Sequence, residues 1–185
     1  GYIKGYLPGV RENGGQYTHA ALWAVRALAE AGRTERAAPL LAMLSAVSHT
    51  STAADVATYK AEPYVIAADV YGVAPHNGRG GWTWYTGSAG WYFRVALESV
   101  LGVELIANRA LSLKPCIPRV WPGFTVHYRL PDGRTIYEIT VQQESSGSAQ
   151  LPSGTVDGVA LEVENGRLMV PLVADDATHV VVVRI

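Results

Sequence analysis

Two segments of the chain place polar, aromatic and glycine residues directly before a predicted helix. The first runs from Tyr6 to His19 and reads YLPGVRENGGQYTH. A helix N-terminus offers free N–H groups and the positive end of the helix dipole, so anions bind there readily. His19 could donate to such an anion. It could equally be a hydrogen-bonded histidine of the core, with Asn13 or Thr18 as the helix cap.

The second segment runs from Gly78 to Trp91 and reads GRGGWTWYTGSAGW. Thr86, Gly87 and Ser88 could present two hydroxyls and several backbone N–H groups to an oxyanion. Three of the five tryptophans of the chain lie in this segment, and their flat apolar faces are of the kind that stack on sugar rings. A structural turn with aromatic packing is the alternative interpretation.

The remaining candidate residues are less distinctive. Glu62 precedes Pro63, and it is either a hydrogen-bond partner for a substrate or an acidic residue that favours a helix start. The histidines have no paired-ligand spacing, so we predict no metal site. The single cysteine, Cys116, excludes an internal disulfide framework and a cysteine-based zinc site. The glycine-rich segment lacks the Gly-Lys-Ser/Thr of a phosphate-binding P-loop.

The elements that must position these residues change in kind along the chain. Helical spacing predicts helices over 16–31, 34–47, 63–71 and 87–101, with Gly32 between the first two. The expected apolar stripes are Ala20, Trp23, Ala24, Ala27 and Leu28, and then Leu40, Leu41, Leu44 and Val47. Alternation predicts strands over 124–130, 135–141, 159–163, 167–170 and 179–185. We therefore expect an α+β chain, with a helical domain over 1–112 and an antiparallel, β-sandwich-like domain over 113–185.

Composition excludes several classes of function. The chain of 185 residues is 49% apolar and 17% charged, with a formal net charge of −1. Because no basic stripe is present, we expect no nucleic-acid partner. No apolar run is long enough to predict a membrane span, and no signal-peptide pattern is present at the N-terminus. The chain begins without Met and reaches its first motif within a few residues, so we expect it to be part of a longer polypeptide.

Four long motifs resemble glycoside hydrolase family 94. They read YLPGVRENGGQYTHAALWAV, YKAEPYVIAADVY, GRGGWTWYTGSAGWYFRVALESVLG and PCIPRVWPGFTVHYR. The resemblance covers about residues 1–141, and the C-terminal tail is similar to the cyclic β-1,2-glucan synthase branch of the family. That family also includes cellobiose, chitobiose and β-1,2-oligoglucan phosphorylases. The fold it implies here is the last helices of an (α/α)₆ barrel followed by a C-terminal β domain.

The resemblance also implies roles for individual residues. His19, Thr86 and Gly87 match the residues that hold phosphate, while Tyr6, Arg11 and Glu12 match the segment that contacts the leaving sugar. We expect Glu62 to bind substrate as well. The catalytic Asp of the family lies upstream of RENGGQYTH, and this chain has no counterpart. Where cellobiose-type enzymes place a substrate-binding Gln after EPYV, the present chain has Ile-Ala-Ala-Asp over 66–69, which favours a β-1,2-glucan substrate.

The chemistry implied is an inverting phosphorolysis of β-linked gluco-oligosaccharides to a sugar 1-phosphate. An inverting hydrolase needs an acid and a base that activates water, whereas phosphate is already anionic and attacks C1 directly. Inorganic phosphate is then a co-substrate, and no cofactor is expected. The other expected partners are the oligosaccharide, the remainder of the polypeptide and a second copy of the parent in a homodimer. The expected location is the cytoplasm, or the cytoplasmic membrane in a synthase parent.

Two further interpretations stay open at this stage. The chain could be a non-catalytic carbohydrate-binding or structural remnant of such a module. It could also be a small helical binding domain with no role in sugar chemistry.

Overall fold

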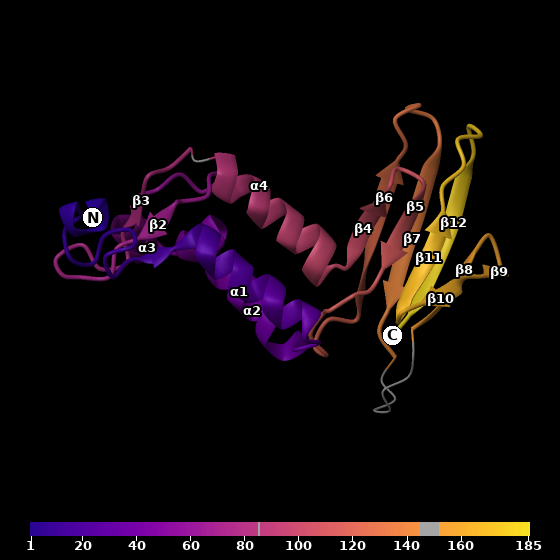
Figure 1. The fold of residues 1–185 in the computed structure, drawn as a ribbon, viewed down its shortest axis with the longest axis horizontal. Coiled ribbons are helices and arrows are strands. Elements are labelled where there is room, and N and C mark those ends of the chain that lie inside the picture. The colour runs from indigo at the N-terminus through magenta and orange to yellow at the C-terminus, as the bar shows by residue number, and fades with distance from the viewer. Residues whose placement is uncertain (85, 145–151) are drawn as a thin grey trace. The chain divides into compact units, whose positions relative to one another are not determined.

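The structure, a computed structural model, describes residues 1–84, 86–144 and 152–185. The chain divides into two compact units, Gly1–Ala96 and Leu97–Ile185. Figure 1 shows the α-helices in the first unit and most strands in the second, so the predicted order of helices followed by strands is confirmed. The units divide earlier than the boundary predicted between 112 and 113. Two unpredicted strands, β4 (Val103–Ile106) and β5 (Ala110–Leu113), pair with the sheet of the second unit.

The first unit contains a helical hairpin of α1 (Thr18–Glu30) and α2 (Thr34–Met43). Gly32 joins them at a φ of +67°, a conformation that glycine adopts at little cost. The buried side chains are Leu22, Val25 and Ala29 of α1 and Ala37, Ala38 and Leu41 of α2. The predicted stripes were therefore largely wrong, and Trp23 is 57% exposed. Both helices are rich in alanine, so apolar residues lie on most faces and periodicity does not single out the buried one.

The third α-helix lies elsewhere than predicted. It is α3 (Ala53–Tyr59), which a capping box opens. The Thr52 hydroxyl accepts from the Asp55 N–H at 3.2 Å, and the Asp55 carboxylate accepts from the Thr52 N–H at 3.1 Å. The helix predicted over 63–71 was wrong. Two short 3₁₀ turns, η1 (Tyr2–Gly5) and η2 (Ala46–His49), complete the helical segments before α4.

A small antiparallel sheet replaces the helix predicted over 63–71. It joins β1 (Gln16–Tyr17), β2 (Asp69–Val70) and β3 (Gly80–Gly81), with β2 in the middle. Tyr17 pairs with Asp69, and Asp69 pairs with Gly81. A Cβ at Gly81 would collide with the Tyr71 ring and with the Asp69 carboxylate, so glycine is required there. The sheet thus brings together three loops that are far apart in the sequence.

The helix predicted over 87–101 is confirmed. It consists of α4 (Thr86–Arg94) and a π-helical continuation, η3 (Val95–Val100). Gly102 ends it at a φ of +69°, where a Cβ would collide with the carbonyl of Lys114. In the described part of the chain, no helix combines the length and the apolar character that a membrane crossing requires.

The second unit contains two sheets. The four-stranded sheet has the order β10 (Glu162–Glu164), β11 (Arg167–Pro171), β5, β4. The five-stranded sheet has the order β6 (Gly123–Arg129), β7 (Ile136–Gln142), β12 (Thr178–Arg184), β8 (Ser153–Val156), β9 (Val159–Ala160). Its β12 and β7 are parallel, so the prediction of a purely antiparallel domain was wrong at this pair. Parallel neighbours need a long crossover, and β8 to β11 supply it.

One core joins the two sheets. Leu111, Leu113, Leu168 and Val170 face it from the four-stranded sheet, and Tyr137, Ile139, Val141, Val181 and Val183 face it from the five-stranded sheet. Burial alternates along β7 and β11, as expected for strands with one covered face. The alternation that predicted these strands therefore reflects a real sandwich core.

A histidine between two carboxylates lies near the start of β12, the middle strand of the five-stranded sheet. The two ring nitrogens of His179 lie 2.7 Å from the Asp157 carboxylate and 3.1 Å from the Asp175 carboxylate. Its ring stacks on Tyr137, with the ring centroids 4.6 Å apart. The hydrogen bond with Asp157, and then that with Asp175, raises the pKa of His179, while His179 lowers the pKa of Asp157. Only the imidazolium can donate to both carboxylates.

We expect His179 to make the stability of the second unit depend on pH. Because its folded pKa is raised, its contribution is complete below the usual value of about 6.5 and is lost as pH rises through the folded pKa. The thermal midpoint should therefore fall between pH 6 and pH 8.5 in the unaltered chain, and fall less in His179→Gln. Calorimetry at both pH values measures this. The control is His127→Gln, which changes an exposed histidine of the same sheet. Equal pH dependence in all three chains would contradict the assignment.

Candidate active site

The loop before α1 is held by a buried carboxylate. The backbone N–H of Arg11 donates to Asp69 Oδ2 at 2.8 Å, and Asp69 is fully buried in the middle strand of the small sheet. Arg11 has a φ of +49°, which residues other than glycine rarely adopt. Burial raises the pKa of Asp69, and the hydrogen bond from Arg11 opposes that rise. The loop conformation therefore depends on a contact between residues 58 positions apart.

The Arg11 side chain lies among aromatic rings. Its guanidinium carbon is 5.4 Å from the ring centroid of Tyr6, 5.5 Å from that of Tyr17 and 5.2 Å from that of Trp82. At these distances the cation is attracted to the ring faces. The Glu12 carboxylate lies 3.5 Å from Arg11 Nε. We call Tyr6, Arg11, Tyr17 and Trp82 the arginine cluster. It contains two of the predicted sugar-contacting residues, Tyr6 and Arg11, and a third, Glu12, lies beside it.

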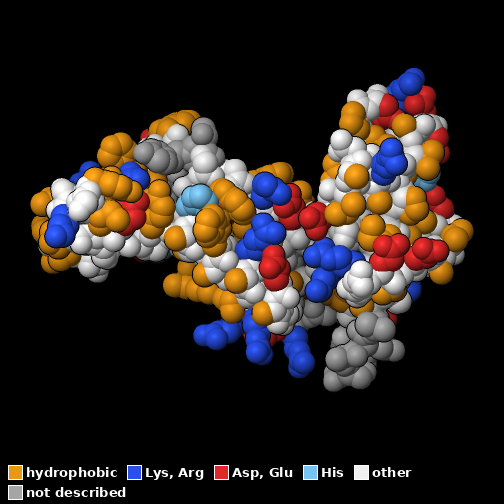
Figure 2. All heavy atoms as spheres, viewed as in Figure 1, with side chains coloured by type: hydrophobic (Ala, Val, Ile, Leu, Met, Phe, Trp, Pro, Cys, Tyr) orange, Lys and Arg blue, Asp and Glu red, His pale blue; other side chains and the backbone are white. Residues whose placement is uncertain are grey.

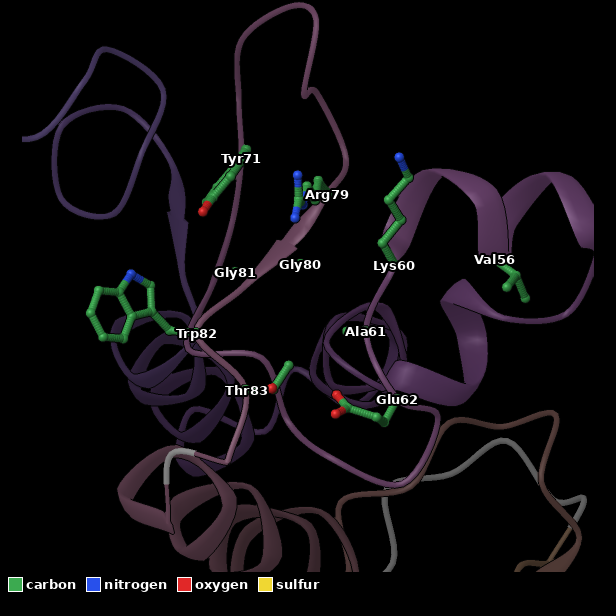
Figure 3. A pocket seen from close by; sticks show the side chains of 10 residues that line it. All are labelled: Val56, Lys60, Ala61, Glu62, Tyr71, Arg79, Gly80, Gly81, Trp82 and Thr83. Carbon is green, nitrogen blue, oxygen red and sulfur yellow. The ribbon is translucent and has the colours of Figure 1, made fainter.

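Glu62 lies in a separate opening beside β3. Its carboxylate accepts from the indole Nε1 of Trp84 at 3.2 Å. A hydrogen bond from its own backbone N–H, followed by the Trp84 bond, lowers the pKa of Glu62. The carboxylate is therefore ionised at neutral pH, which suits an acceptor of hydroxyl hydrogens better than a proton donor. Figure 3 shows Glu62 with the other side chains that line this opening.

His19 lies in the first turn of α1, where the spacing predicted it. Its ring centroid is 5.1 Å from that of Trp23 and 5.5 Å from that of Trp91 on α4. Its Nε2 is buried and has no hydrogen-bond partner among the described residues. We call His19, Trp23 and Trp91 the histidine cluster. Figure 2 shows hydrophobic side chains gathered on this face of the first unit, over α1 and α4. The alternative of a hydrogen-bonded core histidine does not fit this environment.

The other two predicted phosphate ligands open α4. Thr86 and Gly87 are its first two residues, but the Thr86 side chain lies outside the description, so its distance from His19 stays untested. A Cβ at Gly87 would meet no atom within 4 Å. Packing inside the chain therefore does not require glycine there, although glycine weakens a helix. This observation is consistent with space kept for a ligand.

Two groups in this region were not predicted to be part of the site. Asp69 positions the loop before α1, and Thr18 ties α1 to the small sheet. Trp82, one of the tryptophans predicted to stack on sugar rings, contacts Arg11. The Thr18 hydroxyl donates to the carbonyl of Ala67 at 2.7 Å, and its N–H donates to that of Ala68 at 2.9 Å. The only sequence signal for Asp69 is its place in the apolar run VIAADV. Among the residues described, no three His, Cys, Asp or Glu side chains gather as metal ligands would.

The arrangement combines two chemical capacities. The start of α4 and the His19 imidazole can donate hydrogen bonds to an anion. The arginine cluster offers aromatic faces and charged groups to a polyhydroxylated ligand. Tyr17, Thr18 and His19 follow one another in the chain, so the arginine cluster and the histidine cluster meet at the start of α1.

Comparison with known proteins relates the chain to carbohydrate-active enzymes. A model described as "Glycosyl hydrolase 94 superfamily, catalytic domain" matches residues 1–102. The chain is 47% identical to cyclic beta-(1,2)-glucan synthase NdvB of Rhizobium meliloti over 153 residues, 83% of this chain and 5% of that protein. It is 32% identical to an N,N'-diacetylchitobiose phosphorylase of Vibrio furnissii over 168 residues, 90% of this chain and 20% of that protein. It is 29% identical to solabiose phosphorylase of Paenibacillus borealis over 182 residues, 98% of this chain and 22% of that protein. The chain thus spans less than a quarter of the length of each relative.

Replacing Asp69 tests whether its carboxylate holds the loop before α1. Asp69→Ala leaves the Arg11 N–H buried without an acceptor, and we expect the free energy of unfolding of the first unit to fall by about 1–3 kcal/mol. Asp69→Asn keeps an acceptor oxygen, so its free energy of unfolding should fall less. Urea unfolding followed by tryptophan fluorescence measures both variants. An equal loss in the two would show that the Arg11 hydrogen bond contributes little.

Proposed function

Because this chain belongs to the glycosyl hydrolase 94 superfamily, we propose that it forms the C-terminal part of an inverting phosphorylase module. In this proposal the module transfers a glucosyl unit from a β-linked gluco-oligosaccharide to inorganic phosphate. The helices α1, α2 and α4 are then the last helices of an (α/α)₆ barrel, and residues 97–185 form the domain that follows it.

The observation that carries the proposal is the packing of His19 against α4. Trp91 contacts the His19 ring and lies on the same helix whose first residues, Thr86 and Gly87, match the phosphate ligands of the family. One tryptophan thus links α1 to the helix that supplies the other ligands. The Nε2 of His19 is buried and has no hydrogen-bond partner among the described side chains and backbone, which supports a role as a donor to a bound anion.

The proposed reaction needs few groups from this chain. A phosphate oxygen attacks C1, the bond from C1 to the glycosidic oxygen breaks, and the leaving oxygen takes a proton from a general acid. His19 and the N–H groups of α4 hold the phosphate, and no cofactor takes part. The Glu12 carboxylate lies against Arg11 and the Glu62 carboxylate accepts from Trp84. In this proposal both carboxylates accept from sugar hydroxyls. We assign the acid to an Asp outside this chain.

The relatives support proposals about the substrate, the partners and the cellular location. The 47% identity to a protein named as a cyclic β-1,2-glucan synthase favours β-1,2-linked glucan as the donor. Tyr6, Arg11, Glu12 and Glu62 would contact its sugars. The remainder of the polypeptide would complete the site, and a homodimer of the parent would be the working form. The site would face the cytoplasm, in a free or a membrane-attached enzyme.

A second candidate function is carbohydrate binding without turnover. The observation that favours it is the exposure of Trp82 and Trp84, at 55% and 67%, beside Glu62. Exposed indoles offer flat faces to sugar rings without any need for phosphate. Glycan binding that phosphate neither strengthens nor weakens would support this second function.

Two glycines of α4 allow an effect on phosphate binding to be distinguished from an effect on helix stability. Neither Gly87 nor Gly90 would meet an atom within 4 Å if a Cβ were added. Each change to alanine should therefore stabilise the helix, by up to about 1 kcal/mol. Only Gly87→Ala should weaken phosphate binding, because its methyl group would occupy the ligand's space. Amide chemical shifts during a phosphate titration measure affinity, and equal phosphate affinity in the two variants would contradict the proposed site.

We also expect the chain alone to release no sugar 1-phosphate. A sugar alkoxide is a poor leaving group, and general acid catalysis of this kind is worth roughly 10²–10⁴-fold. The purified chain is incubated with phosphate and β-1,2-, β-1,3- or β-1,4-linked oligoglucosides, with His19→Ala as the control. Glucose 1-phosphate formed above the control level would place the acid within these residues.

A further inference from the structure

The opening beside β3 is a cavity of about 490 Å³. This volume lies within the roughly 300–1,000 Å³ typical of small-molecule sites. Figure 3 shows Tyr71 and Arg79 on one side and Lys60 and Glu62 on the other, with the β3 backbone at Gly80 and Gly81 between them. Gly80 and Gly81 have no side chains that could fill the opening.

The polar groups around the opening include both donors and acceptors. Lys60 and Arg79 form no ion pair with any residue in the described ranges, while the Glu62 carboxylate is ionised and held by Trp84. Thr83 adds a hydroxyl. A glucosyl unit carries hydroxyls that both donate and accept, so this set matches a sugar better than a simple anion, which Glu62 would repel.

Two residues that line the opening have an unusual backbone conformation. Lys60 and Trp82 have φ values of +54° and +49°, and Trp84, which donates to Glu62, has a φ of +65°. Bulky residues rarely adopt this region, and such residues gather at binding sites where the surrounding structure imposes the conformation. A Cβ at Gly80 would press on the ring of Tyr59, and a Cβ at Gly81 would collide with the ring of Tyr71, which itself lines the opening, so both positions leave no room for a side chain.

The opening adjoins the arginine cluster through Trp82. This residue lines the opening, and its ring centroid lies 5.2 Å from the Arg11 guanidinium carbon. Figure 3 shows its indole pointing from the end of β3 away from Lys60 and Glu62. The indole therefore stands between the proposed position of the leaving sugar and the opening.

We propose that the opening is a further subsite for the sugar that follows the leaving sugar in the oligosaccharide. This inference rests on the proposed function. Lys60 and Arg79 donate to hydroxyls of that sugar, and Glu62 accepts from one of them. The subsite makes the chain prefer saccharides of three or more units over disaccharides.

The test compares saccharide length with a charge-matched pair of double variants. Binding of β-1,2-linked glucobiose and glucotriose to the full chain is measured by tryptophan fluorescence. In the unaltered chain we expect the trisaccharide to bind roughly fivefold to tenfold more tightly, the equivalent of one or two net hydrogen bonds. Lys60→Ala with Arg79→Ala should remove this gain and leave disaccharide affinity unchanged. Arg33→Ala with Arg36→Ala removes two exposed cations at the start of α2 and should keep the gain.

Each outcome of the binding experiment either supports or overturns the proposed subsite. A trisaccharide bound no better than the disaccharide, or a gain that survives in the Lys60 and Arg79 variant, overturns the subsite and leaves the proposed function standing. A chain that binds neither saccharide overturns the proposed sugar site together with this one. Circular dichroism of both double variants checks that the fold is intact.

Discussion

The hydrogen bond from the Arg11 N–H to the buried Asp69 carboxylate is the contact on which the rest of the site depends. A carboxylate buried at this position is costly unless it is paired, so the loop before α1 must return to the small sheet. Once it does, the Arg11 side chain lies among Tyr6, Tyr17 and Trp82, which come from three separate segments. A hydrogen bond between residues 58 positions apart thereby sets the position of a charged side chain.

The same sheet determines where α1 begins. Its strand β1 leads directly into α1, and Thr18 bonds the carbonyls of Ala67 and Ala68. His19 follows at once, which places the imidazole beside α4 and against Trp91. The residues that we propose to contact sugar and those that we propose to hold phosphate are therefore connected through one small sheet, whose three short strands lead to the N-termini of α1 and α4. Each of these three strands contributes only two residues to the pairing.

The sequence predicted the parts of this molecule that depend on local pattern. Helices α1 and α4 and the hairpin of β6 and β7 lie where helical spacing and alternation predicted them, although the spacing did not identify the buried face of α1, and the motif around His19 is contiguous. The strands β4 and β5 were missed because their turn places Ala107 and Asn108 at positive φ without a glycine to signal it. The role of Asp69 was missed because its partner lies 58 residues away. The parallel pairing of β12 with β7 likewise has no local signature.

The central position of β12 in its sheet affects the order in which the second unit folds. This strand is the last of the chain's elements, yet it lies in the middle of the five-stranded sheet, between β7 and β8. Its Val181 and Val183 are fully buried in the shared core. During synthesis on the ribosome, the pair β6 and β7 and the pair β8 and β9 therefore cannot join into the five-stranded sheet until β12 emerges. Contacts between distant parts of a chain slow folding, so this unit should acquire its structure late and in one step.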